Sequence, residues 1–296
     1  MTIALASAFH PRGEIPRLAK FLPPLRDAYA RLCVSVPPTA SADDVNALRA
    51  LNIAVAVTRD WSHGRHAALQ LALESNAAHI HYADLDRLLR WIETRPNEWR
   101  AMVERAQQCD GLIVGRTARA YATHPRALVE TEAISNLVGS YLLGAIDAAT
   151  RRHGDTEKNS PRHPITASPR QFDLSAGSKS FSRRAAEFLL AHSPPGRALG
   201  MDAEWVVLLH RAGFAIEYVE VEGLDWESAD QFADNAADAE TQRRAAERYD
   251  ADPKHWARRV EVAMEIVAAG FDAMQRELKT DRLENRAAES QSAQSF

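Results

Sequence analysis

The first 120 residues of the chain alternate short apolar runs, rich in β-branched side chains, with longer amphipathic segments. This alternation is typical of β-α-β units, in which parallel strands form a sheet and the intervening helices cover its faces. Strands are predicted at residues 3–8, 32–36, 53–57, 79–82 and 111–115, and helices at 15–29, 42–51 and 63–75. This part of the chain is therefore predicted to be an α/β unit with a Rossmann-like, mostly parallel sheet.

Longer helical patterns dominate the rest of the chain. A helix is predicted at 125–149, a loop rich in Pro, Arg and Ser at 151–170, a helix capped by Ser182, a helix at 202–212 and a strand at 214–221. Helical segments at 228–249 and 253–278 follow. We therefore expect a first half at 1–122, a second half at 123–227, a C-terminal helical extension at 228–280 and a tail at 281–296, which is predicted to be disordered because it has no apolar face.

Composition narrows the class of protein. The net charge of −4, from 36 Lys and Arg against 40 Asp and Glu, gives no global positive field that would hold nucleic acid. Only two cysteines occur, which fits a reducing cytoplasm. The N-terminus lacks the basic residues of a secretory leader, and the longest apolar stretch, 137–150, is too short to span a bilayer. We expect a cytoplasmic protein that binds no nucleic acid and has no transmembrane segment; a homo-oligomer is compatible with the sequence.

An acidic pair follows the predicted strand at 79–82. In open α/β sheets, ligands collect beyond the carboxyl ends of the strands, and this is where Asp84 and Asp86 stand. Two carboxylates one residue apart can bind Mg²⁺ or Mn²⁺, which favour oxygen ligands and often bridge to phosphates. The alternative is a turn followed by a helix cap, since Asp is favoured at both positions.

The thirty residues before the acidic pair carry a resemblance. The run IAVAVTRDWSHGRHAALQLALESNAAHIHYADLD resembles GT-A glycosyltransferases of the family-two type: a strand, a polar Gly-containing loop, an Arg-led helix, a strand and Asp-x-Asp. The resemblance implies a GT-A fold in which Gly64 and Arg65 contact the nucleotide and sugar, and in which Asp60 is a further contact. It also implies that Asp84 and Asp86 hold a metal bound to a diphosphate. The loop departs from the family pattern, because it lacks the usual Asn-x-Gly and Arg-Asn pairs.

Two further strand ends fit the same resemblance. The first strand ends at SAFHPR, where family members hold the nucleobase and ribose, so Ser7, His10 and Arg12 are predicted to bind the donor. For His10 and Arg12 the alternative is that they are ordinary exposed loop residues. Arg116 follows the fifth predicted strand, where a guanidinium could neutralise diphosphate oxygens. An ion pair with an acid of the following helix is equally compatible with the sequence.

A second block, DLSAGSKSFSRRAAEFLL followed by GMDAEWVVLLHRAGFAIEYVEVEGLDWE, resembles the acceptor half of GT-A enzymes, including glucosyl- and mannosyl-phosphoglycerate synthases. The resemblance implies that Gly177 and Ser178 face a phosphate or a sugar, and that Asp202 and Glu204 orient the donor or accept the acceptor's proton. His210 lies eight residues after Asp202, close to the same face of the predicted helix, and is a candidate third metal ligand. Helix capping by Asp202, a solvated Glu204 and a structural His210 are the alternatives.

These observations favour glycosyl transfer from a nucleoside-diphosphate sugar to the hydroxyl of a small molecule or glycan, assisted by Mg²⁺ or Mn²⁺. A non-catalytic nucleotide-sugar binding protein of the same fold and a sugar nucleotidyltransferase are the alternatives. A nucleotidyltransferase would need a Gly-rich phosphate loop after the first strand, and that loop has one glycine. No Gly-x-Gly-x-x-Gly follows the first strand, which disfavours a dinucleotide-dependent dehydrogenase.

Overall fold

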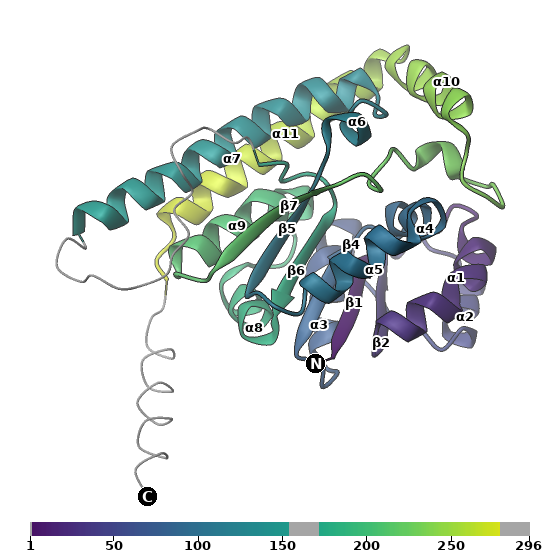
Figure 1. Cartoon of the computed structure of the whole chain (residues 1–296), viewed down its shortest axis with the longest axis horizontal. Coiled ribbons are helices and arrows are strands. Elements are labelled where there is room, and N and C mark those ends of the chain that lie inside the picture. Colours follow the sequence, from purple (N-terminus) through teal and green to yellow (C-terminus); the bar gives the residue numbers. More distant parts are fainter. Residues whose placement is uncertain (1, 154–171, 279–296) are drawn as a thin grey trace, which may run out of the picture.

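Apolar side chains alternate between the two faces of a central sheet. The computed structural model describes residues 2–153 and 172–278, and within these ranges the sheet has seven strands in the order β3-β2-β1-β4-β6-β5-β7 (Figure 1). The strands are β1 (Ile3–Ala8), β2 (Arg31–Val36), β3 (Ala54–Val57), β4 (His79–Ala83), β5 (Gly111–Arg116), β6 (Ser178–Ser182) and β7 (Ile216–Val221). The five strands predicted in the first 120 residues are thus confirmed to within one residue at each end.

Two helical layers cover this sheet, because a parallel strand must bury both of its faces. On one face Ile3 and Leu5 of β1 pack with α1 (Ile15–Ala28), α2 (Ala42–Ala50), α4 (Leu85–Thr94) and α5 (Pro96–Arg105). On the other face Ala4 and Ala6 pack with α3 (Gly64–Leu73), α8 (Arg183–His192) and α9 (Met201–Arg211). The period-two pattern of the strand sequence therefore divides the core into two apolar clusters.

Strand β6 is the one antiparallel member of the described sheet. It lies between β4 and β5, with Ile80 opposite Phe181 and Leu112 opposite Ser180. The other strand pairs are parallel, so the prediction of a mostly parallel sheet is confirmed. The insertion of β6 between two parallel strands brings Gly177, the residue before it, next to the carboxyl end of β4.

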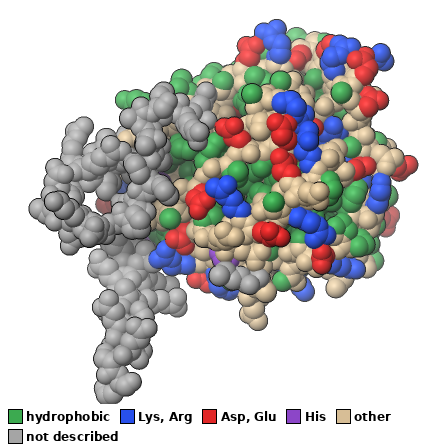
Figure 2. Space-filling view, in the orientation of Figure 1, with side chains coloured by type: hydrophobic (Ala, Val, Ile, Leu, Met, Phe, Trp, Pro, Cys, Tyr) green, Lys and Arg blue, Asp and Glu red, His purple; other side chains and the backbone are tan. Residues whose placement is uncertain are grey.

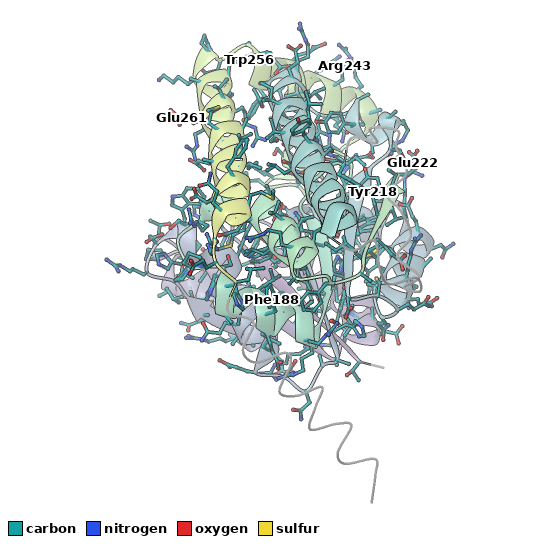
Figure 3. The ribbon with its side chains drawn as sticks, turned by 90° about the vertical axis from the view of Figure 1, so that its left-hand side faces the viewer. Phe188, Tyr218, Glu222, Arg243, Trp256 and Glu261 are labelled. Atoms are coloured by element: carbon teal, nitrogen blue, oxygen red, sulfur yellow. The ribbon has the colours of Figure 1, made fainter. Side chains whose placement is uncertain are left out.

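Long helices extend the molecule beyond the sheet. Helix α7 (Arg126–His153) and helix α11 (Pro253–Gln275) run side by side, and α10 (Ala239–Asp250) contacts both of them at one end (Figure 1). In Figure 3, turned by 90°, α11 with Trp256 and Glu261 stands next to α7, and Arg243 marks α10. The short elements that remain are η1 (Trp61–His63), α6 (Ala118–Tyr121), η2 (Ala198–Gly200) and η3 (Ser228–Asp230). Helices α10 and α11 lie within the segment 228–280, for which a C-terminal helical extension is predicted.

Several local predictions differ from the structure. Helices α4 and α5 were not among the predicted helices, although Leu85–Thr94 has buried side chains around most of its surface. The segment 228–249 is helical only at its two ends, in η3 and α10. Residues 151–153 belong to the end of α7, whereas 154–170 of the predicted loop and the predicted tail at 281–296 lie outside the described residues.

The molecular surface shows no continuous field of one sign on the face drawn in Figure 2, where acidic and basic side chains alternate. This distribution agrees with the net charge of −4. None of the helices in the described ranges is both long and apolar enough to pass through a membrane.

The core around α9 depends on Trp205, which is 1% exposed and packs edge-on against Tyr82 and Phe181 at ring-centroid distances of 5.8 and 5.6 Å. We expect Trp205→Ala to lower the free energy of unfolding by about 3–5 kcal/mol, because it leaves a large cavity in a packed core. The half-exposed Trp61 provides the control: Trp61→Ala should cost less than about 1 kcal/mol. Urea denaturation followed by circular dichroism measures both values, and equal losses for the two variants would contradict the expectation.

Candidate functional site

Two adjoining cavities lie at the edge where β1, β2, β3 and β4 end. The first, of about 310 Å³, is lined by residues at or just after these strand ends, including Ala8, Ser35, Thr58 and Tyr82. We call it the strand-end cavity. Because the strands are parallel, their carboxyl ends meet at one edge, and the loops that follow them form a common wall. A cavity at this position is where ligands of open α/β sheets bind.

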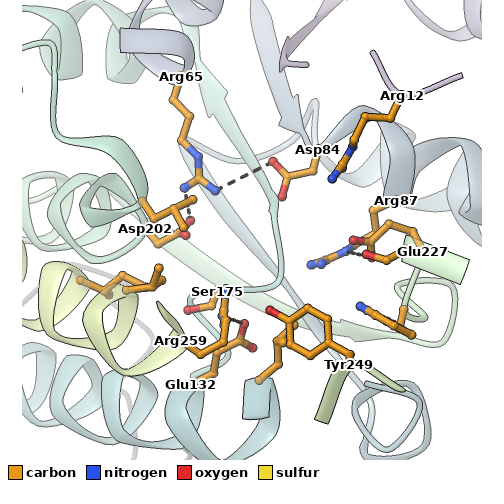
Figure 4. Close-up of a pocket in the computed structure, with 16 residues that line it drawn as sticks. Arg12, Arg65, Asp84, Arg87, Glu132, Ser175, Asp202, Glu227, Tyr249 and Arg259 are labelled. Atoms are coloured by element: carbon orange, nitrogen blue, oxygen red, sulfur yellow. Dashed lines mark hydrogen bonds and ion pairs between the residues drawn. The ribbon is translucent and has the colours of Figure 1, made fainter. Parts of the chain in front are cut away.

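The second cavity, of about 240 Å³, is lined in part by the long helices, and we call it the helix-side cavity. Its walls include Glu132 of α7, Tyr249 of α10, and Arg259 and Val262 of α11. Ser175 lines it from the segment before β6 (Figure 4). This cavity therefore draws on parts of the chain that are far apart in the sequence.

Three residues line both cavities: Arg65, Asp84 and Leu199. Arg65 is in the first turn of α3, and Asp84 follows β4 at the position before α4. The guanidinium of Arg65 lies between two carboxylates, with Nη1 2.7 Å from Asp202 Oδ1 and Nη2 3.9 Å from Asp84 Oδ1 (Figure 4). A cation and a carboxylate thus stand together at the junction of the two cavities.

The Asp202 carboxylate is held from two sides. Besides Arg65, it accepts a hydrogen bond of 2.6 Å from Nζ of Lys179, a side chain of β6 that is 2% exposed. Burial alone would raise the pKa of Asp202, but the positive charges of Arg65 and Lys179 outweigh this effect and hold the pKa below its ordinary value. Asp202 is therefore ionised at neutral pH and is a weak proton acceptor.

Asp84 depends on the glycine before β6. The backbone N–H of Asp84 donates to the carbonyl of Gly177 at 2.9 Å, and Oδ1 accepts a hydrogen bond from the Tyr82 hydroxyl at 3.1 Å. Gly177 has φ +77°, and a Cβ on it would lie 2.3 Å from Oδ2 of Asp84. A glycine is required here both for the left-handed backbone and for the space that the carboxylate occupies.

Asp86 is directed differently from Asp84. Its Oδ1 accepts from the backbone N–H of Arg87 at 2.8 Å, and its Oδ2 is 3.3 Å from Nη2 of Arg12. Burial, together with the carboxylates of Glu227 and Asp84, raises the pKa of Asp86 to about 7. Asp84 therefore faces both cavities, whereas Asp86 lies outside their linings in a group of neighbouring acids.

The structure brings six of the residues predicted from the sequence to the cavity walls. His10 and Gly64 line the strand-end cavity, Arg12 and Asp202 line the helix-side cavity, and Arg65 and Asp84 line both. Gly177 contacts Asp84 without belonging to either lining.

Other predicted residues lie elsewhere. Arg116 is buried, with Nε 2.7 Å from Asp173 and Nη2 2.6 Å from Glu132, so the ion pair left open as its alternative is the one observed. Glu204 is fully buried, 2.7 Å from Nη2 of Arg276, and does not line either cavity. Glu204 is therefore a buried, paired carboxylate and not the solvated acid that the sequence also allows.

The remaining predicted residues have local partners. The Ser178 hydroxyl lies 2.9 Å from Nε2 of the buried His81. Asp60 caps η1 by accepting from the backbone N–H of Ser62 at 2.8 Å. Ser7 is fully buried in β1, and its Oγ has no hydrogen-bond partner among the described residues.

The helix-side cavity contains residues that sequence reasoning missed: Glu132, Ser175, Tyr249 and Arg259. The pattern of α7 and α11 marks Glu132 and Arg259 only as polar positions on long amphipathic helices. No local motif distinguishes them, because their proximity arises from the packing of two helices that are more than a hundred residues apart.

The donor groups at the junction fit a divalent metal that is shared with a phosphate ligand. In the described ranges no three His, Cys, Asp or Glu side chains are grouped so as to enclose a metal ion, so His210 does not join the two aspartates in a protein-only shell. Asp84 nevertheless presents a carboxylate to both cavities, and magnesium-type ions commonly take one or two carboxylates and complete their shell with phosphate oxygens and water. The chemistry of this donor set is thus compatible with Mg²⁺ or Mn²⁺.

Comparison with known proteins establishes the fold. No protein-family model matches the chain, and no curated protein matches its sequence. The structure is similar to that of the glucosyl-3-phosphoglycerate synthase of Mycobacterium tuberculosis, with a TM-score of 0.50 and 13% sequence identity over 93% of this chain and 81% of that chain. A structure of that enzyme with Mn²⁺, UDP-glucose and phosphoglyceric acid has a TM-score of 0.49 and 12% identity, covering 93% and 80% of the two chains. A mannosyltransferase from Pyrobaculum calidifontis with GDP-mannose and Mn²⁺ has a TM-score of 0.33 and 13% identity, covering 97% and 79%. The predicted α/β fold of the GT-A type is confirmed by the first of these similarities.

The raised pKa of Asp86 predicts a pH-dependent stability in the metal-free chain. Between about pH 4 and pH 7 the folded chain keeps a proton on Asp86 that the unfolded chain has lost, so the unfolding free energy falls as the pH rises through this window. Asp86→Asn has no carboxyl group to ionise, so its free energy of unfolding does not fall in this way. In EDTA at about pH 8 the variant should be more stable than the unaltered chain by up to about 4 kcal/mol, and near pH 4 the two should be equal.

Denaturant titration across this pH range measures the difference. The control is Asp27→Asn, which removes an exposed carboxylate 2.7 Å from Arg100 and should change stability by less than about 1 kcal/mol at every pH. A stability gap for Asp86→Asn that does not grow with pH would contradict the assignment.

Proposed function

We propose that this chain transfers a sugar from a nucleoside-diphosphate sugar to an acceptor hydroxyl. The observation that carries the proposal is the junction at which Arg65 and Asp84 line both cavities, since a group-transfer enzyme must hold donor and acceptor on two sides of one reacting centre. The structural similarity to the glucosyl-3-phosphoglycerate synthase of Mycobacterium tuberculosis supports the transfer of a glycosyl group.

On this proposal the strand-end cavity holds the nucleoside. His10, Ser35 and Thr58 give it polar groups, and Trp61, 54% exposed at its rim, gives it an aromatic surface. The diphosphate lies toward the junction, where Asp84 would hold the metal and Asp86 would join it on release of its contact with Arg12. When bound, a divalent ion offsets the negative charge that grows on the departing nucleoside diphosphate.

The transfer itself breaks the bond between the anomeric carbon and the diphosphate oxygen, whose electron pair stays with the diphosphate. A new bond forms between that carbon and the acceptor oxygen, and the proton of the acceptor hydroxyl passes to the departing diphosphate oxygen. Arg65 is placed to donate hydrogen bonds to the leaving diphosphate, because its guanidinium is fixed by Asp202 at the junction. Asp202 positions Arg65, and its lowered pKa makes it a poor base for the acceptor's proton.

One observation favours a second candidate, a nucleotide-sugar binding protein without turnover. Of the carboxylates that line the helix-side cavity, Glu132, Asp202 and Glu227 each lie within 3 Å of a Lys or Arg nitrogen. None of these three is free to act as a general base. Nucleotide binding without formation of a glycoside would support this candidate.

Metal-dependent nucleotide binding tests the proposal. Calorimetry with UDP and with GDP, each with Mn²⁺, is expected to show binding of at least one nucleotide. Asp84→Ala and Asp86→Ala should each weaken that binding by about tenfold or more, because a charge-assisted ligand of the metal-diphosphate unit is lost. Omission of Mn²⁺ should have a similar effect on the unaltered chain.

Asp43→Ala is the matched control, since Asp43 is an exposed acid in the first turn of α2 that lines neither cavity. Its nucleotide affinity should equal that of the unaltered chain. Unchanged affinity in both Asp84→Ala and Asp86→Ala would remove the acidic pair from the mechanism.

A further inference from the structure

The helix-side cavity is rich in charge, yet the charges on its walls balance. Four arginines and four carboxylates line it: Arg12, Arg65, Arg87, Arg259, Asp84, Glu132, Asp202 and Glu227. A cavity intended for an anion ordinarily presents a surplus of cations, because the desolvated anion must be compensated. The equal numbers indicate a different kind of ligand.

Each of these arginines already has a carboxylate partner. Arg65 lies 2.7 Å from Asp202, Arg87 lies 2.9 Å from Glu227, Arg12 lies 3.3 Å from Asp86, and Arg259 pairs with Glu132. Figure 4 shows the first two of these contacts on opposite sides of the cavity. The positive charges of Arg65, Arg87 and Arg259 are therefore largely satisfied before any ligand enters.

The charged residues directly behind the cavity lining are also paired. Lys179 adds a cation next to Asp202, and Arg116 adds one between Glu132 and Asp173. Each of these two cations is in contact with a carboxylate, so neither is left to compensate an anionic ligand. A metal bound with a nucleotide sugar would not change this, because the metal offsets the charge of the diphosphate.

Two buried polar atoms of the lining residues have no partner among the described residues: Oγ of Ser175 and Nε of Arg259. The nitrogen can only donate a hydrogen bond, whereas the hydroxyl can donate or accept. Nearby, the carboxylates of Glu132 and Asp202 can only accept. A ligand hydroxyl satisfies both kinds of group at once, whereas a carboxylate or phosphate can only accept and is repelled by the two acids.

From this arrangement we infer that the helix-side cavity binds an uncharged, polyhydroxylated acceptor, a sugar or a polyol, and discriminates against phosphorylated or carboxylated acceptors. The inference rests on the proposed function for its statement that the ligand is an acceptor. The discrimination arises from paired charges that cannot compensate an anion, and the affinity arises from alternating donors and acceptors that match hydroxyl groups.

The experiment compares ligands that differ in one charged group. The chain is saturated with Mn²⁺ and the nucleoside diphosphate that it binds, and is titrated with methyl α-glucoside against glucuronate and with glycerol against 3-phosphoglycerate, by calorimetry and by competition. The neutral member of each pair should bind about tenfold or more tightly. Equal or tighter binding of the anionic members, or no binding of the neutral ones at tens of millimolar, overturns the inference.

A variant that removes one negative charge tests whether the paired charges cause the preference for neutral ligands. Glu132→Gln leaves a surplus positive charge on Arg116 and Arg259, so the ratio of neutral to anionic affinity should fall by about tenfold. Glu227→Gln, which unpairs Arg87 on the opposite wall, makes the same test if the first variant does not fold. Glu130→Gln is the matched control on α7, because Glu130 is exposed and pairs with Arg126 outside the cavity; its ratio should not change.

Separate measurements test nucleotide binding and the preference for an uncharged acceptor. Nucleotide binding is measured first on the same samples, and its absence counts against the proposed function. Intact nucleotide binding, with a ratio that is unchanged in both Glu132→Gln and Glu227→Gln, overturns the charge-balance inference alone.

Discussion

The buried contact between Arg65 and Asp202 organises the functional edge of this molecule. Two charges taken out of water are costly unless each is compensated by geometry and by further hydrogen bonds. Here Asp202 is compensated twice, by Arg65 of α3 and by Lys179 of β6, with nitrogen-to-oxygen distances of 2.7 and 2.6 Å. The contact ties three elements together at one point: α3, α9 and the antiparallel strand. It also sets the guanidinium beside Asp84, where the two cavities meet.

Much of the fold could be predicted from local patterns. The strands of the first 120 residues have apolar runs of the right length, and Ser41 and Ser182 cap helices as their positions indicate. Strand β6 could not be placed in this way. Its sequence, SKSFS, has one apolar residue, and it is a strand because β4 and β5 bind it from both sides. Tertiary pairing, rather than local propensity, decides such a segment.

The site was predictable where one short segment carries it and unpredictable where distant segments meet. The prediction that an arginine and an aspartate gather at the strand ends follows from the topology of a parallel sheet, and both Arg65 and Asp84 line the cavities there. The sequence could not show that Asp84 and Asp86 turn different oxygens to different neighbours. Nor could it show that Glu204, two residues after Asp202 on the same helix, is fully buried and paired with Arg276. These outcomes depend on how the helices pack against one another, which the spacing of residues in the sequence does not show.

The origin of the cavity walls bears on the order in which the chain acquires its surfaces during synthesis. The strand-end cavity is complete once residues up to 199 have been made, because nothing later in the chain lines it. The helix-side cavity also needs Tyr249, Arg259 and Ile266, which are synthesised later than every residue of the strand-end cavity. N-terminal segments emerge first during synthesis. The walls of the helix-side cavity are therefore the later of the two to be completed.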